Sequence, residues 1–375
     1  MTRTNLVQIL LEYVTFKVGR KRNMDYKTIK DISFKGQIVL VRVDYNVPMK
    51  DGKITDDLRI RASLPTLQYL REGGAKKIIL ISHLGRPEGR DKSLSLKPVA
   101  ERLAKLIPDV SFVDDVSGPD VETAVNKLGK GGILLLENLR FYAGEEKNSD
   151  DFIREIIDAT GAEVFVQDGF AVVHRAHAST NAVANHLPVY AGLLLEKEII
   201  NLSKVTEKPD KPLLLIIGGA KVDDKQPLIE KFSKFADQIV VGGKIAADGY
   251  KGSGKIYVAE DFDEDSDGNK LDVGPVSTGK IAGFIADAKT IIWNGLMGKA
   301  EDPAYATAST IVAEMMGEKL GAETVVCGGD TTGFVENLVE EHPNLEYSLI
   351  STGGGAALEF LLGKELPGIA VLETK

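Results

Sequence analysis

The sequence contains a single cysteine, Cys327, among its 375 residues. One cysteine cannot form an intrachain disulfide or an all-cysteine metal site, and its rarity fits a protein of the reducing cytoplasm. Basic residues are in the minority, because 46 Lys and Arg stand against 55 Asp and Glu, which gives a formal net charge of −9. Proteins that bind nucleic acid or membrane surfaces usually carry a broad positive field, so we expect no nucleic acid and no membrane as partner.

Long hydrophobic runs are missing as well. The apolar stretch Leu6–Phe16 is interrupted by Gln8 and Glu12, and no small-residue cleavage site follows it. Such a stretch is too short and too polar to cross a bilayer, and it makes a poor signal peptide. We therefore interpret residues 1–23 as an N-terminal extension and expect the folded protein to begin near residue 24.

From residue 36 onward, short apolar runs alternate with amphipathic stretches. This alternation predicts parallel strands joined by right-handed helical crossovers, which make a doubly wound, Rossmann-like sheet of the α/β class. The pattern occurs twice, so we expect two such lobes. The predicted strands are Ile38–Val43, Lys77–Ile81, Ile133–Leu136 and Val164–Gln167 in the first lobe, and Pro212–Ile217, Gln238–Val241, Thr290–Trp293 and Thr324–Cys327 in the second.

A charged, proline-bearing joint, Glu207–Lys211, follows the helical run Glu196–Val205. The chain is too long for one comfortable core, and this joint divides it into lobes of similar size. We expect a first lobe over residues 24–192, a connecting helix and hinge over 193–211, and a second lobe over 212–352. Residues 353–375 form a C-terminal segment. Further helical runs are predicted at Leu64–Glu72, Leu96–Leu106 and Ala356–Leu362.

Basic and polar side chains gather directly after the predicted strands of the first lobe. An arginine guanidinium recognises carboxylate or phosphate through paired hydrogen bonds, and ligands of doubly wound sheets bind beyond the carboxyl ends of the strands. The set therefore predicts a site for a small ligand with two anionic groups. Its members are Asp44, Asn46, Arg59, His83, Arg86, Arg140 and Arg175.

Glycine clusters occupy the corresponding places in the second lobe. Glycine lets a backbone approach phosphates, helix N-termini supply N–H donors, and a carboxylate such as Asp330 can hold Mg²⁺ on nucleotide phosphates. These features predict a nucleotide site. The residues concerned are Gly219, Lys221, Lys225, Gly243, Asn294, Gly328, Gly329, Asp330, Thr331, Gly353 and Gly354.

Three further features of the sequence argue against other kinds of site. Gly249–Lys255 is similar to a P-loop, but Ile256 replaces its Ser or Thr and a strand-like run follows where a helix is needed. The acidic run from Asp263 begins like an EF-hand, but Gly274 stands where the bidentate Glu belongs, so we expect a solvated loop. No GxGxxG fingerprint follows the first strand, which argues against a nicotinamide-dependent oxidoreductase.

The motifs, in their order and spacing, resemble the phosphoglycerate kinase family over nearly all of the chain after Met24. The stretches that carry the resemblance are Arg42-Val-Asp-Tyr-Asn-Val-Pro48, Ser82-His-Leu-Gly-Arg-Pro87, Glu137-Asn-Leu-Arg-Phe141, His174-Arg-Ala-His-Ala-Ser179, Gly218-Gly-Ala-Lys-Val222, Trp293-Asn-Gly295, Gly328-Gly-Asp-Thr331 and Ser351-Thr-Gly-Gly-Gly355.

The resemblance implies reversible phosphoryl transfer from 1,3-bisphosphoglycerate to MgADP, giving 3-phosphoglycerate and ATP, in a cytoplasmic monomer. It implies that the basic set of the first lobe holds the glycerate ligand and that the C-terminal tail packs on this lobe. Lys221 and Lys225 would contact phosphates, Asp330 would bind Mg²⁺, Glu301 would contact the ribose and Asn294 would lie near the nucleotide. Catalysis would rest on positioning and charge neutralisation by Arg59, Lys221, Mg²⁺ and the N–H groups of the loop with Gly353 and Gly354.

The second lobe departs from the family pattern. Leu296 stands in place of a proline, Lys299-Ala300 replaces a small-or-apolar residue and Phe, and residues 243–272 form a shorter stretch than usual. Because the family's adenine pocket lies in this region, the base preference stays open. An alternative function is a non-catalytic homologue that binds glycerate phosphates and has a degenerate adenine pocket. Lys221 and Asp330 argue against it, because binding alone would not require them.

Overall fold

The computed structural model describes residues 26–374, so the predicted extension over residues 1–23 lies outside the described part. The chain divides into two compact units. The first contains the residues up to Glu196 together with those from Leu366 onward, and the second is Lys197–Glu365. The C-terminal portion of the first unit thus begins at Leu366, whereas the sequence interpretation set the start of the C-terminal segment at residue 353.

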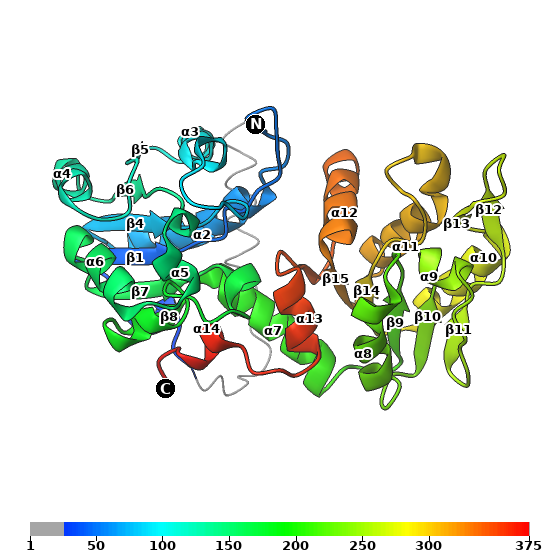
Figure 1. The fold of residues 1–375 in the computed structure, drawn as a ribbon. Helices are drawn as coiled ribbons and strands as arrows, with labels where there is room; N and C mark the ends of the chain where they lie inside the picture. The colour runs from blue at the N-terminus through cyan, green and yellow to red at the C-terminus, as the bar shows by residue number, and fades with distance from the viewer. Residues whose placement is uncertain (1–25, 375) are drawn as a thin grey trace. The chain divides into compact units, whose positions relative to one another are not determined.

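The first unit contains a parallel six-stranded sheet with the strand order β5-β6-β4-β1-β7-β8 (Figure 1). The inner strand β1 is buried on both of its faces, which requires helices on either side of the sheet. The strands are β1 Ile38–Arg42, β4 Lys77–Ile81, β5 Val110–Phe112, β6 Gly132–Leu135, β7 Val164–Gln167 and β8 Val189–Ala191; β2 Met49–Lys50 and β3 Lys53–Ile54 form a small hairpin.

The second unit contains another parallel six-stranded sheet, ordered β11-β10-β9-β14-β15-β16. In chain order this is 3-2-1-4-5-6, the arrangement whose crevice between the first and fourth strands binds ligands. The strands are β9 Leu213–Ile217, β10 Gln238–Val241, β11 Ile256–Val258, β14 Thr290–Asn294, β15 Glu323–Cys327 and β16 Leu349–Ile350; β12 Phe262–Glu264 and β13 Lys270–Val273 form a hairpin.

The predicted fold class is confirmed, and all eight predicted strands are present with ends shifted by one residue at most. Those eight are the four inner strands of each sheet. The outer strands β5, β8 and β16 were not predicted, and β11 was indicated only as a strand-like run. These edge strands have only two or three residues, which is too few for a recognisable pattern of apolar residues in the sequence.

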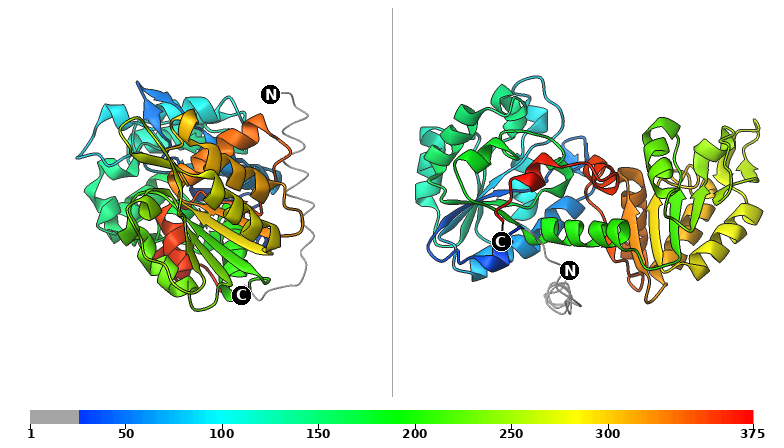
Figure 2. Two further views of the ribbon diagram at one scale, coloured as in Figure 1. Left: turned by 90° about the vertical axis from the view of Figure 1, so that its right-hand side faces the viewer. Right: turned by 90° about the horizontal axis from the view of Figure 1, so that it is seen from below.

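Helices lie beside the strands in each unit, as the further views in Figure 2 show. Two of them, α2 and α7, begin at least three residues before their predicted starts; α2 continues through Pro65, a residue more usual in a first helical turn. The helices are α2 Leu58–Glu72, α3 Lys97–Leu103, α4 Pro119–Lys127, α5 Ala143–Glu146, α6 Asp150–Thr160, α7 Leu193–Glu207, α8 Val222–Phe232, α9 Gly243–Ala247, α10 Pro275–Asp287, α11 Thr307–Gly317, α12 Gly329–Glu341, α13 Gly355–Leu361 and α14 Pro367–Ala370.

The P-loop-like stretch and the acidic run form ordinary secondary structure. Ile256 begins strand β11, so no helix follows the glycines before it. The acidic run forms the turn of the β12–β13 hairpin, where Asp265 accepts hydrogen bonds from the backbone N–H groups of Asp267 and Asn269, both at 2.9 Å. No helix within residues 26–374 is long and apolar enough to cross a membrane.

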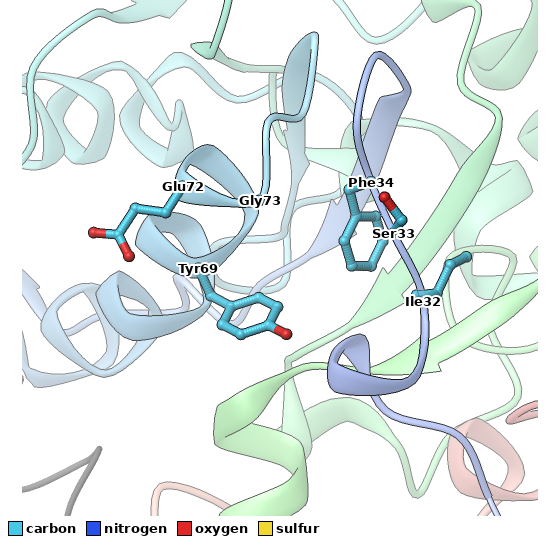
Figure 3. Close-up of a pocket in the computed structure, with 6 residues that line it drawn as sticks. All are labelled: Ile32, Ser33, Phe34, Tyr69, Glu72 and Gly73. Atoms are coloured by element: carbon cyan, nitrogen blue, oxygen red, sulfur yellow. The ribbon is translucent and has the colours of Figure 1, made fainter.

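A cavity of about 370 Å³ lies in the first unit, lined by Ile32, Ser33, Phe34, Tyr69, Glu72 and Gly73. In Figure 3 Tyr69 projects from α2 toward the segment that precedes β1, whereas the side chain of Glu72, in the last turn of α2, points away from that segment. This segment and Gly73 precede β1 and β4 in the chain, so the cavity lies at the amino ends of the strands. The predicted site residues follow the carboxyl ends, and the cavity is separate from them.

Candidate functional site

The fold brings the predicted residues of the first unit to one edge of its sheet. They follow β1, β4, β6 and β7, which are neighbours in the order β6-β4-β1-β7, so their carboxyl ends lie side by side. Asp44 and Asn46 follow β1, Arg59 lies in the first turn of α2, His83 and Arg86 follow β4, Arg140 lies in the short 3-10 helix Leu139–Phe141 after β6, and Arg175 follows the 3-10 helix Phe170–Val172 after β7.

Two of these residues hold each other directly. Arg59 forms an ion pair with Asp44, whose side chain is buried. Asp44 Oδ1 also accepts a hydrogen bond from the Asn46 N–H at 3.2 Å, which fixes the turn after β1. The guanidinium of Arg59 is thus oriented before any ligand arrives.

The loop after β4 is fixed from both sides. Its Gly85 N–H donates to Asn46 Oδ1 at 2.8 Å, and Arg140 donates to the Gly85 carbonyl oxygen at 2.6 Å. Asn138 donates through Nδ2 to the carbonyl oxygen of Leu84 at 2.7 Å. The next residue, Arg86, is exposed, and its side chain makes no hydrogen bond or ion pair with a described residue. A rigid loop therefore presents an unpaired guanidinium.

His83 lies among the arginines of this edge. It is 3% exposed, and burial lowers its pKa well below the usual value of 6.5; the positive charges of four arginines lower the pKa further. A neutral imidazole surrounded by guanidinium groups suits a small ligand with two anionic groups, because the ligand neutralises charges that otherwise repel one another. The four arginines are Arg42, Arg140, Arg59 and Arg175.

In the second unit, several glycines serve the packing of loops. The Gly218 N–H donates to the Asn294 carbonyl oxygen at 3.0 Å, and the Gly219 N–H donates to the Leu296 carbonyl oxygen at 2.8 Å. A Cβ on Gly243, whose φ is +58°, would lie 2.7 Å from the Leu296 oxygen and 2.8 Å from the Gly219 nitrogen. The loops after β9, β10 and β14 thus pack backbone against backbone, which leaves no room for side chains.

Other glycines of the predicted set face open space. A Cβ on Gly329 or Gly354 would meet nothing within 4 Å. Gly329 begins α12, and Gly354 immediately precedes α13, so both stand where helical N–H groups lack intrahelical partners. Packing explains Gly243 and a φ of +50° explains Gly354, whereas neither applies to Gly329; the open space at Gly329 and Gly354 allows a ligand to approach the backbone.

The polar residues of this edge differ in how they are held. Lys225 donates to Asn294 Oδ1, while Asn294 Nδ2 is buried without a partner among the described residues. Burial lowers the pKa of Lys225, and the nearby Asp330 carboxylate acts in the opposite direction. Thr331 accepts the Gly295 N–H at 2.9 Å, so its side chain supports the loop after β14. The orphaned amide of Asn294 is a donor available to a ligand oxygen.

Lys221, Glu301 and Asp330 are exposed, and their side chains make no hydrogen bond or ion pair with a described residue. Lys221 immediately precedes α8, and Asp330 lies in the first turn of α12. Within residues 26–374 no group of three or more His, Cys, Asp or Glu side chains could hold a metal ion. A divalent cation here would need ligand oxygens besides Asp330.

Two buried carboxyl groups next to these sites were not among the predicted site residues. Glu198 on α7 accepts hydrogen bonds from Ser351 Oγ at 2.8 Å and from the Thr352 N–H at 2.7 Å, directly before Gly353 and Gly354. Asp168 after β7 accepts from Thr66 Oγ1 at 2.9 Å and from the Leu194 N–H at 3.0 Å, at the start of α7. Burial raises the pKa of each carboxyl to about 7.

No motif marks Glu198 as functional, because its partners lie about 150 residues further along the chain. Asp168 directly follows strand β7, as members of the basic set follow the neighbouring strands. Its side chain lies instead at the junction of α2 and α7, where it accepts hydrogen bonds from Thr66 and Leu194, while its backbone N–H donates to the Arg42 carbonyl oxygen at 2.9 Å.

A family model described as "Phosphoglycerate kinase" matches residues 29–255 and 246–364. A phosphoglycerate kinase from Dictyoglomus turgidum is 40% identical over 405 aligned residues, which cover 94% of this chain and 100% of the relative. The alignment is longer than the chain, so the relative has segments that this chain lacks. The two matched segments of the family model meet near residues 246–255, within the stretch noted above as short.

Two solved structures agree with this finding. The phosphoglycerate kinase of Coxiella burnetii is 33% identical with a TM-score of 0.75, and that of Pyrococcus horikoshii OT3 is 28% identical with a TM-score of 0.80. In both comparisons 92% of this chain and 98% of the other chain are covered.

Proposed function

The chain belongs to the phosphoglycerate kinase family and is an enzyme of that family, and we propose that it transfers a phosphoryl group reversibly between 1,3-bisphosphoglycerate and MgADP. The products in the forward direction are 3-phosphoglycerate and ATP. The observation that carries this proposal is the edge β6-β4-β1-β7, where arginines surround a neutral histidine. A glycerate with a phosphate at one end and a carboxylate at the other supplies the two anionic groups that this edge lacks.

For the first unit, the proposed ligand contacts are Asp44, Asn46, Arg59, His83, Arg86, Arg140 and Arg175. The second unit would bind the nucleotide through Gly219, Lys221, Lys225, Gly243, Asn294, Gly328, Gly329, Asp330 and Thr331, with Glu301 at the ribose. The orphaned Nδ2 of Asn294 and the open positions at Gly329 and Gly354 support this assignment. Gly243 and Thr331 would contribute through their backbone, because packing fixes the first and the side chain of the second supports a loop.

The chemistry requires little acid–base work from the protein. The attacking atom is a carboxylate oxygen in one direction and a phosphate oxygen in the other, and both are ionised near pH 7. The barrier is lowered by holding the reactants in line and by neutralising charge on the phosphoryl group in transit. We assign this role to Arg59, Lys221 and the N–H groups at Gly353 and Gly354. Asp44 orients the guanidinium of Arg59 for this purpose.

We propose Mg²⁺ as the metal, bound with the nucleotide. The donor set fits, because Asp330 offers one exposed carboxylate and Mg²⁺ is commonly held by one or two carboxylates together with substrate phosphates. When bound, the ion neutralises charge on the nucleotide phosphates. Asp330 would orient it at the N-terminus of α12, where the helix dipole also favours phosphate.

Transfer requires the two ligands to meet, yet Arg59 belongs to the first unit and Lys221 to the second. We propose that the units close around the ligands and exclude water, because water would otherwise hydrolyse the acyl phosphate. The joint at residues 193–211, with helix α7, would be the hinge. We further propose that the enzyme acts as a cytoplasmic monomer in glycolysis; the single, buried Cys327 supports a reducing compartment.

A coupled assay with 3-phosphoglycerate, Mg²⁺ and either ATP or GTP tests this proposal. Turnover with ATP is the expected result, and the ratio of the two rates measures how Leu296, Lys299 and the short stretch after Gly243 affect the base preference. Tight binding of 3-phosphoglycerate without turnover by either nucleotide would contradict the proposal and favour the non-catalytic alternative.

A further inference from the structure

The first unit buries a guanidinium that makes no direct hydrogen bond to a carboxylate. Arg42, the last residue of β1, is 1% exposed. It donates to the Val43 carbonyl oxygen at 2.6 Å, to Ser179 Oγ at 2.8 Å and to His83 Nδ1 at 3.1 Å. A buried cation is strongly destabilising unless its charge is compensated and its donors are satisfied.

The compensating charge reaches Arg42 through one hydroxyl group. Glu145 on α5 is fully buried and accepts hydrogen bonds from Ser179 Oγ at 2.6 Å and from the Ser179 N–H at 3.0 Å. A serine hydroxyl has one hydrogen and two acceptor positions. Because Ser179 gives its hydrogen to Glu145, its oxygen is free to accept from Arg42. The order of donation is therefore fixed from Arg42 to Ser179 to Glu145.

Glu145 stays ionised at the end of this chain of hydrogen bonds. Burial by itself would raise the pKa of Glu145, but the nearby His177, the charge of Arg42 and the hydrogen bonds of Ser179 outweigh burial, so the pKa is lowered. His177 Nδ1 lies 3.7 Å from the carboxylate. The negative charge needed to balance Arg42 is thus present inside the unit.

The contact of Arg42 with His83 determines where the histidine carries its proton. A guanidinium only donates hydrogen bonds, so His83 Nδ1 must act as the acceptor. A neutral imidazole that accepts at Nδ1 carries its hydrogen on Nε2. The groups that face His83 from neighbouring elements are Arg42, Arg59, Arg140 and Arg175, all of them cations, and none of them favours a second proton.

We propose that Glu145 and Ser179 are positioning residues which fix Arg42 and, through it, hold His83 as a neutral Nε2–H donor for an oxygen of the anionic ligand. The identity of that ligand rests on the proposed function, whereas the state of the histidine does not. Arg42 and Ser179 lie 137 residues apart, so the arrangement exists only in the folded unit.

Nitrogen-15 NMR of histidine-labelled protein without ligand tests the proposal directly. The chain has five histidines, and a His83→Gln sample assigns the signal of interest. In the wild type at pH 7 we expect His83 to show the pattern of a neutral Nε2–H imidazole. A charged ring, or a hydrogen on Nδ1, would overturn the proposal. This measurement requires no substitution of Arg42, Ser179 or Glu145.

The variant Ser179→Ala removes the bridging hydroxyl and leaves Arg42 Nε without its acceptor. We expect His83 to become a mixture of tautomers and the KM for 3-phosphoglycerate to rise about tenfold, the loss of roughly one hydrogen bond. The KM for the nucleotide should stay unchanged. Glu145→Gln should likewise produce a mixture of His83 tautomers and raise the KM for 3-phosphoglycerate, because it removes the charge that balances Arg42.

Thr160→Val is the matched control, because Thr160 is a buried hydroxyl of the same unit that bonds to the Ile156 carbonyl oxygen at 2.7 Å. It should leave the His83 spectrum and both KM values unchanged. An unaltered His83 spectrum in Ser179→Ala would overturn the proposal, and so would equal effects of Ser179→Ala and Thr160→Val. A wild type that lacks turnover would contradict the proposed function alone, since the spectrum is recorded without substrate.

Discussion

The two sites are prepared for their ligands in different ways. In the first unit most charged side chains of the site are already held, Arg59 by Asp44 and Arg140 by Glu146 and the Gly85 carbonyl oxygen, and Arg86 is the exposed exception. In the second unit the backbone is fixed through glycines, while Lys221 and Asp330 remain exposed and unpaired. A small ligand binds more tightly to a preformed site, because the protein side chains are already ordered and binding then costs little conformational entropy. A nucleotide brings its own charges, and the second site needs chiefly an accessible backbone.

The largest effect should come from the preformed site. Arg59→Ala is expected to lower kcat about 10³-fold, because a positioned charge on the transferring group is lost. Nucleotide affinity should be nearly unchanged, and the fluorescence of Trp293, the chain's one tryptophan, next to Asn294, can measure it. Arg61→Ala is the control, since Arg61 lies on the same helix and pairs with Asp57. Near-normal turnover of Arg59→Ala would remove Arg59 from the mechanism.

The corresponding change in the second unit should have a somewhat smaller effect. Lys221→Ala is expected to lower kcat about 10²-fold and to change either KM by less than about threefold, because the side chain has no partner before the phosphates arrive. Steady-state kinetics with both substrates measure this. Lys234→Ala removes an exposed lysine beyond the other end of α8 and should be silent. A rise in the nucleotide KM with unchanged kcat would mean that Lys221 only binds.

Two glycines of the second unit distinguish packing from ligand access. Gly218→Ala should reduce the free energy of unfolding by about 2 kcal/mol, because the new Cβ meets the carbonyl oxygens of Gly295 and Leu296. Gly329→Ala has open space and should cost less than about 1 kcal/mol, yet weaken nucleotide binding about tenfold. Urea unfolding and nucleotide titration measure the two quantities. Equal destabilisation by both variants would contradict this distinction.

The smallest effect concerns a feature that both units share, a buried carboxyl group with a pKa of about 7. In the folded chain Asp168 and Glu198 stay protonated up to about pH 7. In the unfolded chain the same groups lose their protons at about pH 4. Their contribution to stability is therefore present below about pH 4 and is lost as the pH rises towards 7. Asp168→Asn and Glu198→Gln should each reduce this fall.

Urea unfolding at pH 5 and pH 7, followed by circular dichroism and by Trp293 fluorescence, measures the pH effect, with the wild type as reference. The fluorescence reports on the second unit and should respond more to Glu198→Gln. Variants with the same pH dependence as the wild type would show that neither carboxyl group takes up a proton on folding.

The inner strands could be predicted from the local sequence pattern, and the outer strands could not. Five consecutive residues that are all buried made each of β9 and β14 recognisable in the sequence, whereas β16 has two residues and its edge position is set by pairing with β15. The site residues that follow inner strands were found for the same reason. Glu145, Ser179 and Glu198 act through partners far along the chain, and no local pattern marks them.

The sequence by itself determined the fold class, the inner strands and the types of residue at their carboxyl ends, because periodicity and residue order are local properties. Only the tertiary structure decided how those residues hold one another. The partner of Arg59, the proton position of His83 and the support of the loop at Gly353 by Glu198 depend on contacts that strand order and register create. Such contacts join residues up to about 150 positions apart, and their geometry exists only once the sheets have formed.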